Sequence, residues 1–375
     1  MIKGVDLSVL FGPGVPVPAP RAVVDALQSV KVMENTGDTA SGFELMFALE
    51  KDSPLSTIFL LAGGNPLPIL RVALVATING KATSLINGVV SATELQPGSG
   101  GQPATLSVKG KDLTATMGHF DFSGIPYPAM PPFARVGLVL AKYAWLGVIP
   151  QVIPSLESAP LPTEKIPRHQ DSDLDYLRTL AREAGYTFFL KPGPAPATSI
   201  AYWGPEIRIG EVQPALTAES GFNTNTEELS FSFGKDEVEI PIVYVQNPLT
   251  KAPIPIPIPD AIPFQPPLGA IPPIPPKIKR LRNTARLNPF EAVARGFAAA
   301  AGASNPVTGR GKIDVLRYGR ILRARALVGV RGAGRAFDGV HYIDSVTHDL
   351  SRGAYKQSFT LKRSGLLPVA NSVPV

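Results

Sequence analysis

Two segments near opposite ends of the chain carry the same pattern. Residues 87–90 (Asn-Gly-Val-Val) begin a strand that leads through a glycine loop to residues 106–110. Residues 338–341 (Asp-Gly-Val-His) begin another strand, which leads through Arg-Gly to residues 359–363. The separations, 88 to 106 and 339 to 359, are similar. An internal repeat of this kind predicts two similar β-barrels, one near each end; the alternative is a chance likeness between two ordinary hairpins.

The rest of the sequence is typical of a mainly β protein with α+β insertions. Pro and Gly contribute 40 and 35 of the 375 residues, so we expect many turns. This length fits two domains of ordinary size or one elaborated domain. The chain has no cysteine, which excludes disulfides, thiolate zinc sites and thiol nucleophiles. Short apolar runs predict strands at 43–50, 69–78, 85–95, 104–109, 229–233 and 239–246, and glycine-broken strands within 313–361.

Two helices and a hairpin are predicted between the repeats. An apolar helix over 132–147 begins at Pro131 and Pro132, and because it is apolar nearly all round we expect it to be buried. The clearest helix is 173–184, with Ser172 as its N-cap and Gly185 at the left-handed position after its end. Residues 186–190 and 200–203 follow as a strand hairpin. Together they predict a small α/β unit.

A proline-rich segment interrupts the second repeat. Between residues 246 and 276 there are 12 prolines, several alternating with isoleucine. Because alternate positions lack an amide donor, we expect extended polyproline II lying along a surface; a mobile linker is the alternative. A helix then follows, capped by Asn288, with Pro289 at its first position and Gly302 at its end.

The net charge of +6 hides an asymmetry between the two parts of the chain. From Lys277 onward there are 18 Lys and Arg against 5 Asp and Glu, and the preceding residues carry a net −7. A basic section of this kind can bind nucleic acid, but it contains no recognition helix, zinc knuckle or aromatic RNA platform. We therefore expect a surface that faces protein or a lumen, with nucleic-acid binding as an alternative.

The acidic run at the start of the helix at 173 resembles a calcium-binding loop only in part. Asp171, Asp173 and Asp175 have the spacing of an EF-hand loop, but Tyr176 stands where glycine is needed and Arg182 where a bidentate glutamate is needed. Helix capping and the helix dipole explain these acids instead.

Other site motifs are also missing. The four histidines, His119, His169, His341 and His348, lack the spacing of a zinc site, and no nucleophile elbow, dinucleotide fingerprint or phosphate loop occurs. His341 and His348 are expected to be surface or sheet residues. We therefore predict no catalytic, cofactor-binding or metal-ligating residues. The N-terminus lacks the features of a secretory signal, no transmembrane helix is predicted, and we expect no membrane insertion by the chain itself.

Three segments resemble one protein family, in the same order along the chain. Residues 169–189 resemble the phage late-control D proteins, with an acidic turn, an aromatic-Leu-x-x-Leu helix and a Gly-aromatic step into an aromatic strand. Residues 339–350 with 359–363 resemble the closing strands of those proteins. Residues 87–90 with 108–113 resemble their first barrel, which ends in a Gly-x-Asp-Leu turn. These proteins are baseplate hubs of contractile tails, similar to the N-terminal part of the type VI secretion spike protein VgrG.

The resemblance implies a structural protein and not an enzyme. It implies a homotrimer in which each chain supplies two tail-tube-like β-barrels, facing a tail tube or tube-initiator protein above and a separate trimeric spike protein below, beside other baseplate proteins. A spike on a separate chain is expected because the sequence ends at residue 375, with no room for an oligonucleotide-binding module and needle. The implied location is the baseplate of a phage tail or injection particle assembled in the bacterial cytoplasm. A β-rich cell-wall hydrolase or cell-wall-binding tail protein is the alternative.

The expected domains are a first barrel at 1–118, a helical and α/β connecting domain at 119–228, and a second barrel at 229–375. The second barrel is interrupted by the proline-rich and helical insertion at 247–309.

Overall fold

A computed structural model gives the arrangement of the chain. It describes residues 4–49, 69–98, 103–155, 159–163, 166–218, 224–234, 239–246, 250, 252–258, 265–271, 277–281, 292–293, 296, 299–300, 305–369 and 373–374. Most of these residues belong to strands. No helix among them is long and apolar enough to span a membrane.

The N-terminal half forms an antiparallel sheet, here called the N-unit. Its strand order is β3-β4-β7-β6-β5-β1, with the short β2 (Val17–Pro18) at the outer edge and α1 (Arg21–Ala26) before β3. Alternating apolar side chains on these strands form one buried cluster that includes Phe43, Phe47 and Leu106. The six main strands are β1 (Asp6–Pro13), β3 (Leu27–Glu34), β4 (Gly42–Leu49), β5 (Leu70–Ile78), β6 (Lys81–Gln96) and β7 (Ala104–Asp112).

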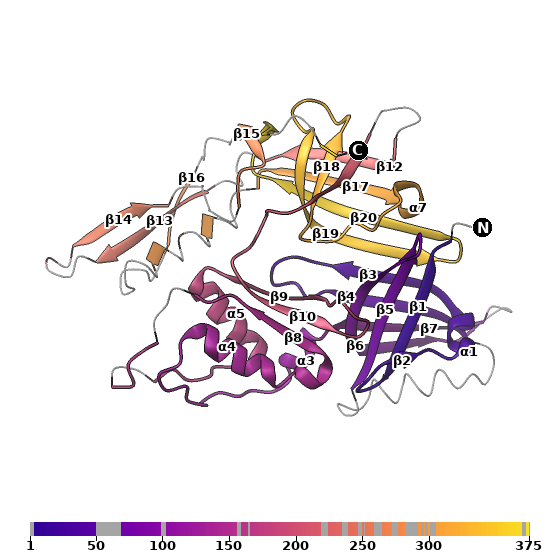
Figure 1. Cartoon of the computed structure of the whole chain (residues 1–375), viewed down its shortest axis with the longest axis horizontal. Helices are drawn as coiled ribbons and strands as arrows, with labels where there is room; N and C mark the ends of the chain where they lie inside the picture. The colour runs from indigo at the N-terminus through magenta and orange to yellow at the C-terminus, as the bar shows by residue number, and fades with distance from the viewer. Residues whose placement is uncertain are drawn as a thin grey trace.

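The C-terminal half forms a second group of strands, here called the C-unit. Its order is β12-β17-β20-β19-β18-β11, with α7 (Val315–Tyr318) after β17. In Figure 1 it lies above the N-unit and carries the orange to yellow strands. Its strands are β11 (Val212–Thr217), β12 (Thr226–Phe233), β17 (Val307–Asp314), β18 (Leu327–Arg331), β19 (Gly339–Ser351) and β20 (Ala354–Arg363).

The two units have the same strand order. When the strands of each unit are numbered from first to sixth along the chain, equal numbers take equal places in the sheet. Five of the six also run in the same direction relative to their neighbours. The exception is the first strand, since β1 runs antiparallel to β5 whereas β11 runs parallel to β18. The β-bulges also correspond. One follows Val90 in β6 and Ile343 in β19, and another interrupts the start of β3 and of β12. Bulges re-aim a strand at a particular residue, so two shared bulges are a stronger likeness than strand order.

The bulges correct the alignment that the sequence repeat predicts. Both predicted hairpins form, as β6–β7 and β19–β20, but the bulges place Val89 level with Tyr342 and not with Val340. The two glycines of the repeat have different roles. A Cβ at Gly88 would meet the Lys111 carbonyl oxygen at 2.3 Å, whereas Gly339 has φ +114° at the start of its strand. The Gly-Val likeness is therefore displaced by two residues.

The units are parts of one sheet. β3 pairs with the second half of β19, from Val346↔Glu34 to Ser351↔Ser29, while the first half of β19 pairs with β18. We call this β3–β19 pairing the seam. The prediction of a mainly β fold is confirmed. The expected pair of barrels is not found closed among the described strands, because the strands of the two units, with β2, form one open sheet of 13 strands.

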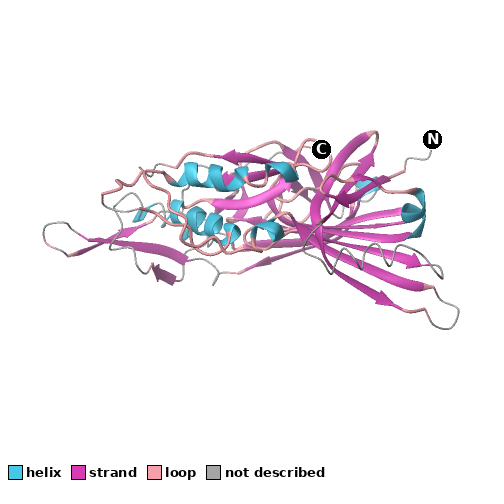
Figure 2. Ribbon diagram, turned by 90° about the horizontal axis from the view of Figure 1, so that it is seen from below, coloured by secondary structure: helices cyan, strands magenta, loops and turns pink. Residues whose placement is uncertain are grey.

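The connecting region between the units packs its helices on a small mixed sheet of order β8-β10-β9. Figure 2 shows these helices gathered in front of the strands. Its elements are α3 (Thr114–Met117), α4 (Pro132–Ala141), the 3₁₀ turn η1 (Ala144–Leu146), β8 (Val148–Val152), α5 (Asp173–Ala184), β9 (Thr187–Pro192) and β10 (Ser199–Gly204).

The predicted helix at 173–184 is confirmed with its caps. The Ser172 hydroxyl oxygen accepts from the Asp175 amide at 3.2 Å, and Gly185 has the left-handed φ of 72°. Leu177 and Leu180 are buried. Burial of one apolar stripe is what the spacing predicts.

The predicted helix at 132–147 is shorter and more exposed than expected. α4 ends at Ala141 because the next amides bond to carbonyls three residues back, which tightens the chain into a 3₁₀ turn. The predicted face is buried, but Leu138 and Trp145 are 53% and 60% exposed. The expectation of burial all round is therefore wrong for these two side chains.

The proline-rich segment is also different from the prediction. Residues Pro253–Pro257 form β14, the edge strand of a sheet of order β14-β13-β16, instead of polyproline II lying along a surface. Residues 247–249, 251, 259–264 and 272–276 of the segment lie outside the described residues. Proline is tolerated at an edge when it occupies every second position, because alternate residues direct their amides away from the partner strand. In Figure 1 this sheet, with β13 (Glu239–Gln246) and β16 (Lys277–Arg280), extends from the body of the molecule.

The end of the insertion contains a short strand and part of a helix. β15 (Gly269–Ile271) pairs with β21 (Leu366–Pro368) and ties the insertion to the C-unit. Most of the helix expected after Asn288 lies outside the described residues. Those that are described, Ala292, Val293, Gly296, Ala299 and Ala300, are helical.

Candidate functional site

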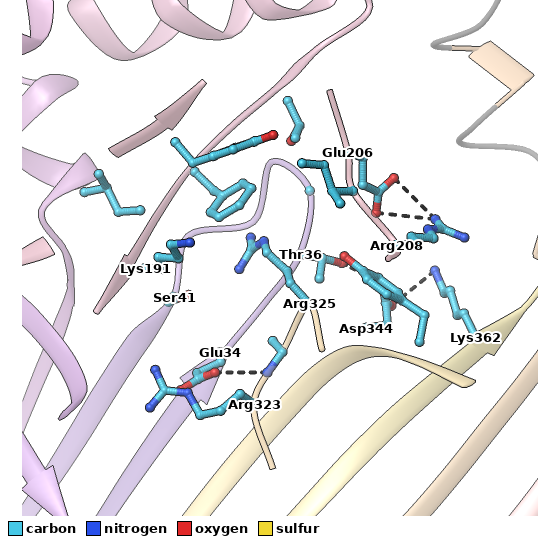
Figure 3. A pocket seen from close by; sticks show the side chains of 18 of the residues that line it. Glu34, Thr36, Ser41, Lys191, Glu206, Arg208, Arg323, Arg325, Asp344 and Lys362 are labelled. Carbon is cyan, nitrogen blue, oxygen red and sulfur yellow. Dashed lines mark hydrogen bonds and ion pairs between the residues drawn. The ribbon is translucent and has the colours of Figure 1, made fainter. Parts of the chain in front are cut away.

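A cavity of about 580 Å³ lies where the N-unit, the C-unit and the connecting region meet. Its walls come from the end of β3 and the following loop, from β9 and β10, from residues 206–209, and from residues 323–325 with β19 and β20. Figure 3 shows that many of its side chains are charged. Because three parts of the fold contribute to it, only the folded chain assembles it.

Glu34, at the end of β3, is the centre of a buried network across the seam. Its carboxylate lies 3.2 Å from the Arg323 Nε and 3.4 Å from the His348 Nε2, and it accepts the Ala324 amide at 3.1 Å. Burial acts to raise the pKa of Glu34, but Arg323 and His348 outweigh burial, so its pKa lies below the usual 4.5. The ionised carboxylate therefore joins the two units.

The other two carboxylates of the cavity also have basic partners. Glu206 lies 3.3 Å from the Arg208 guanidinium. Asp344, the bulged residue of β19, lies 3.2 Å from the Lys362 Nζ and accepts the Thr36 hydroxyl at 2.5 Å.

Two bases of the cavity, Arg325 and Lys191, form no ion pair and no side-chain hydrogen bond with the residues that the structure describes. The Arg325 guanidinium carbon lies 3.8 Å from the centre of the Phe189 ring, a cation–π contact. Figure 3 shows Lys191 and Arg325 pointing toward one another. Burial lowers the pKa of Lys191, and the nearby charge of Arg325 lowers it further.

A second buried network lies in the connecting region, around Asp173. Its carboxylate accepts from Lys142 Nζ and from the Tyr143 hydroxyl, both at 2.6 Å, and the His169 Nε2 lies 3.4 Å away. Asp173 and His169 are both almost completely buried. The interpretation of Asp173 as a helix-dipole residue is therefore incomplete, because tertiary partners hold this carboxylate.

The histidines are placed in the interior or on a helix end. His341 and His348 are sheet residues, as expected, but both are completely buried, which corrects any surface placement. Burial and the charge of Arg363 lower the pKa of His341 to about 3, so it is neutral. His119 is exposed beside α3. Among the described residues no group of three His, Cys, Asp or Glu side chains could hold a metal ion.

The motif residues act as loop anchors. The Asp112 carboxylate of the Gly-Lys-Asp-Leu turn accepts the Ser41 and Thr114 amides at 3.1 and 3.0 Å. Asn87 bridges two parts of the fold, since its amide accepts from Arg71 at 3.0 Å and donates to the Ser199 hydroxyl at 3.0 Å. The sequence singled out these motifs without revealing their partners, which are distant in the chain.

Comparisons with known proteins place the fold in a class. No family model matches the sequence, and no curated protein matches it at the sequence level. Among solved structures, a tail protein from Neisseria meningitidis MC58 is 14% identical with a TM-score of 0.62, over 97% of this chain and 98% of that one. The 43 kDa tail protein of prophage MuSo2 from Shewanella oneidensis is 12% identical with a TM-score of 0.60, over 96% and 99%.

A third similar structure comes from a PdpA-VgrG complex. A chain of the lidded Francisella PdpA-VgrG complex is 9% identical with a TM-score of 0.60, covering 99% of this chain and 54% of that one. The chain thus has the fold found in phage tail proteins and in this complex. At these identities the likeness concerns the fold.

Proposed function

We propose that the chain is a structural baseplate hub of a contractile tail or injection system, which adapts a six-fold tail tube to a three-fold spike. The observation that carries this proposal is the repeated unit: the same strand order and the same two bulges occur twice in one chain. Three chains would present six similar units. A six-fold ring can then be matched by a trimer without leaving alternate subunits unpaired.

The likeness to tail proteins and the sequence resemblance to the late-control D proteins support the same role. The proposed partners are two further copies of the chain, a tail tube or tube-initiator protein, a separate trimeric spike and other baseplate proteins. The proposed location is the baseplate of a virion or injection particle, assembled in the bacterial cytoplasm. In this proposal the two units are tube-like barrels completed in the assembly. The expected divisions are 1–118, 119–228 and 229–375, but β11, the first strand of the C-unit, moves the proposed start of the second unit from residue 229 back to residue 212.

The path of the 13-stranded sheet supports a way of assembling the ring. It ends at β12 on one side and at β2 beside β1 on the other. Edge strands carry backbone groups available for pairing with another chain. The β12 edge of one chain would meet the β1–β2 edge of the next, a head-to-tail contact that closes after three copies.

Light scattering after size exclusion tests the trimer. We expect a mass about three times the 39.7 kDa of one chain, alone or with the spike protein. A monomer that binds neither tube nor spike protein would contradict the proposal. A peptidoglycan-degradation assay tests the non-enzymatic part, and we expect no activity.

Cross-linking tests the proposed edges, and the chain is suited to it because it has no native cysteine. Val17 and Ser230 are exposed on β2 and β12. With a short bismaleimide, a V17C/S230C variant should give a covalent trimer, and each single variant should give at most dimers. Dimers from the double variant at the level of the single variants would contradict the edge contact.

A further inference from the structure

The charges that line the junction cavity do not balance. Five basic side chains face three carboxylates, and each carboxylate has a basic partner other than Arg325 or Lys191, as described above. Within the described part of the chain, no acid lies within ion-pair distance of these two bases; Glu34, Glu206 and Asp112 act on Arg325 only over longer distances. Two neighbouring cations that share a partly buried site repel each other unless an anion lies between them.

Arg325 is held in place by its backbone and by its ring contact. Its amide donates to the Ile343 carbonyl at 2.8 Å, and its φ of 66° is a conformation that costs energy for a residue other than glycine. Such strain persists where surrounding contacts impose it, and it is concentrated at functional positions. The Phe189 ring covers one face of the guanidinium, so the N–H donors in its plane remain available.

We propose that the junction cavity binds an oxyanion, a carboxylate or a phosphate, between the guanidinium of Arg325 and the ammonium of Lys191. The guanidinium presents a planar pair of donors, which matches two oxygens of either group, and the ammonium supplies a second positive charge. Phe189 and Tyr202 provide an aromatic wall beside the anion. This binding is separate from the proposed hub function, and neither depends on the other.

Thermal shift of the full-length chain at constant ionic strength is the first test. Inorganic phosphate and sulfate form one arm, and acetate and a short glutamate-containing peptide form the other. We expect a saturable rise of the melting temperature in at least one arm, and the responding arm identifies the source of the oxyanion. A rise that does not saturate with anion concentration, or no rise in either arm, would overturn the proposal.

Matched variants locate the site. K191Q and R325Q should weaken binding of the responding anion at least tenfold, whereas K81Q and R320Q, at exposed positions, should bind as the parent does. If R325Q does not fold, K191Q decides, because Lys191 is exposed enough to be replaced. Equal binding by K191Q and K81Q would overturn the assignment.

Chemical labelling gives an independent readout. Acetylation of Lys191, followed by mass spectrometry, should slow at least severalfold when the responding anion is present, while acetylation of Lys81 should be unaffected. Equal protection of both lysines, or of neither, would contradict binding at this cavity.

Discussion

The N-unit and the C-unit have the same strand order, yet they fill equivalent positions with different chemistry. Counting from the shared bulges, Leu106 of β7 corresponds to Gln357 of β20, and both are completely buried. Leu106 pairs with Phe47 of β4, and Gln357 pairs with Ile313 of β17, which takes the equivalent place in the C-unit. Leu106 packs in an apolar core. Gln357 exchanges hydrogen bonds of 2.9 Å with the backbone of Leu322 in both directions. One unit is held mainly by packing there, the other by a polar network.

The ends of the same strands show the contrast in charge. Asp112 of β7 corresponds to Arg363 of β20. Asp112 accepts backbone amides, whereas Arg363 donates to the carbonyls of Gly365 and Asp338, at 2.7 and 2.8 Å, and to those of Phe337 and Ala336. Each strand end thus holds a loop with a buried ionisable side chain, an acid in one unit and a base in the other. The loop at Asp112 offers amides and the loop at Arg363 offers carbonyls, so strand order does not dictate side-chain chemistry.

The largest expected effect comes from giving the N-unit the residue of the C-unit. L106Q should destabilise the chain by about 3 to 5 kcal/mol, because it removes apolar packing and buries an amide with no partner. Denaturant unfolding measures the change. K109Q on the exposed side of the same strand is the control, and an equal, small effect in both variants would contradict the apolar nature of this core.

Removing the charge that anchors the C-unit loop should cost somewhat less. R363Q should destabilise by about 2 to 4 kcal/mol, because several buried carbonyls lose their donor. Hydrogen exchange should show the loss at residues 336–338. R320Q is the matched control, and unchanged protection of the loop in R363Q would exclude the anchoring role.

The reverse exchange at the core position should be milder than L106Q. Q357L should destabilise by about 1 to 3 kcal/mol, since leucine gains burial while the Leu322 amide and carbonyl lose their partner. If Q357L proves as damaging as L106Q in the same unfolding assay, the two cores do not differ in the way proposed.

The smallest effect concerns the pH dependence of the seam. Because the pKa of Glu34 is lowered in the folded chain, its ionised form stabilises the fold above the unfolded pKa, near 4.5, and this stability is lost as pH falls through the folded value. E34Q should cost about 1 to 2 kcal/mol at neutral pH and show a smaller loss of stability below pH 4.5. Thermal unfolding across pH measures both. If stability falls equally with decreasing pH in E34Q and in the parent, another group causes the loss of stability in acid.

The sequence predicted what depends on local pattern. The helix at 173–184 follows from its cap, its stripe and Gly185, and the hairpins follow from β-rich runs bounded by turn residues. What it missed depends on partners distant in the chain. From the sequence, Asp173 is a helix-dipole residue, because its partners Tyr143 and Lys142 lie about 30 residues earlier in the chain. The alternating prolines at 253–257 exclude a central strand but not an edge strand.

The junction cavity was not predicted at all. Phe189 and Lys191 lie on β9, whereas Arg325 comes from a loop far along the chain, and none carries a local motif. The positive φ at Arg325 also has no signal in its neighbours, because the conformation is imposed by contacts with β19.

The seam has a mechanical consequence. Its register pairs run side by side along β3 and β19, from Val346↔Glu34 to Ser351↔Ser29. A load that slides one unit along the strands must break all of these pairs together, whereas a load that tilts the units apart opens the pairs one after another from an end. The joint is therefore stiff in shear and weak in peeling. Glu34 lies at one of the two ends from which the pairs can open, so its contacts with Arg323 and His348 reinforce that end of the joint.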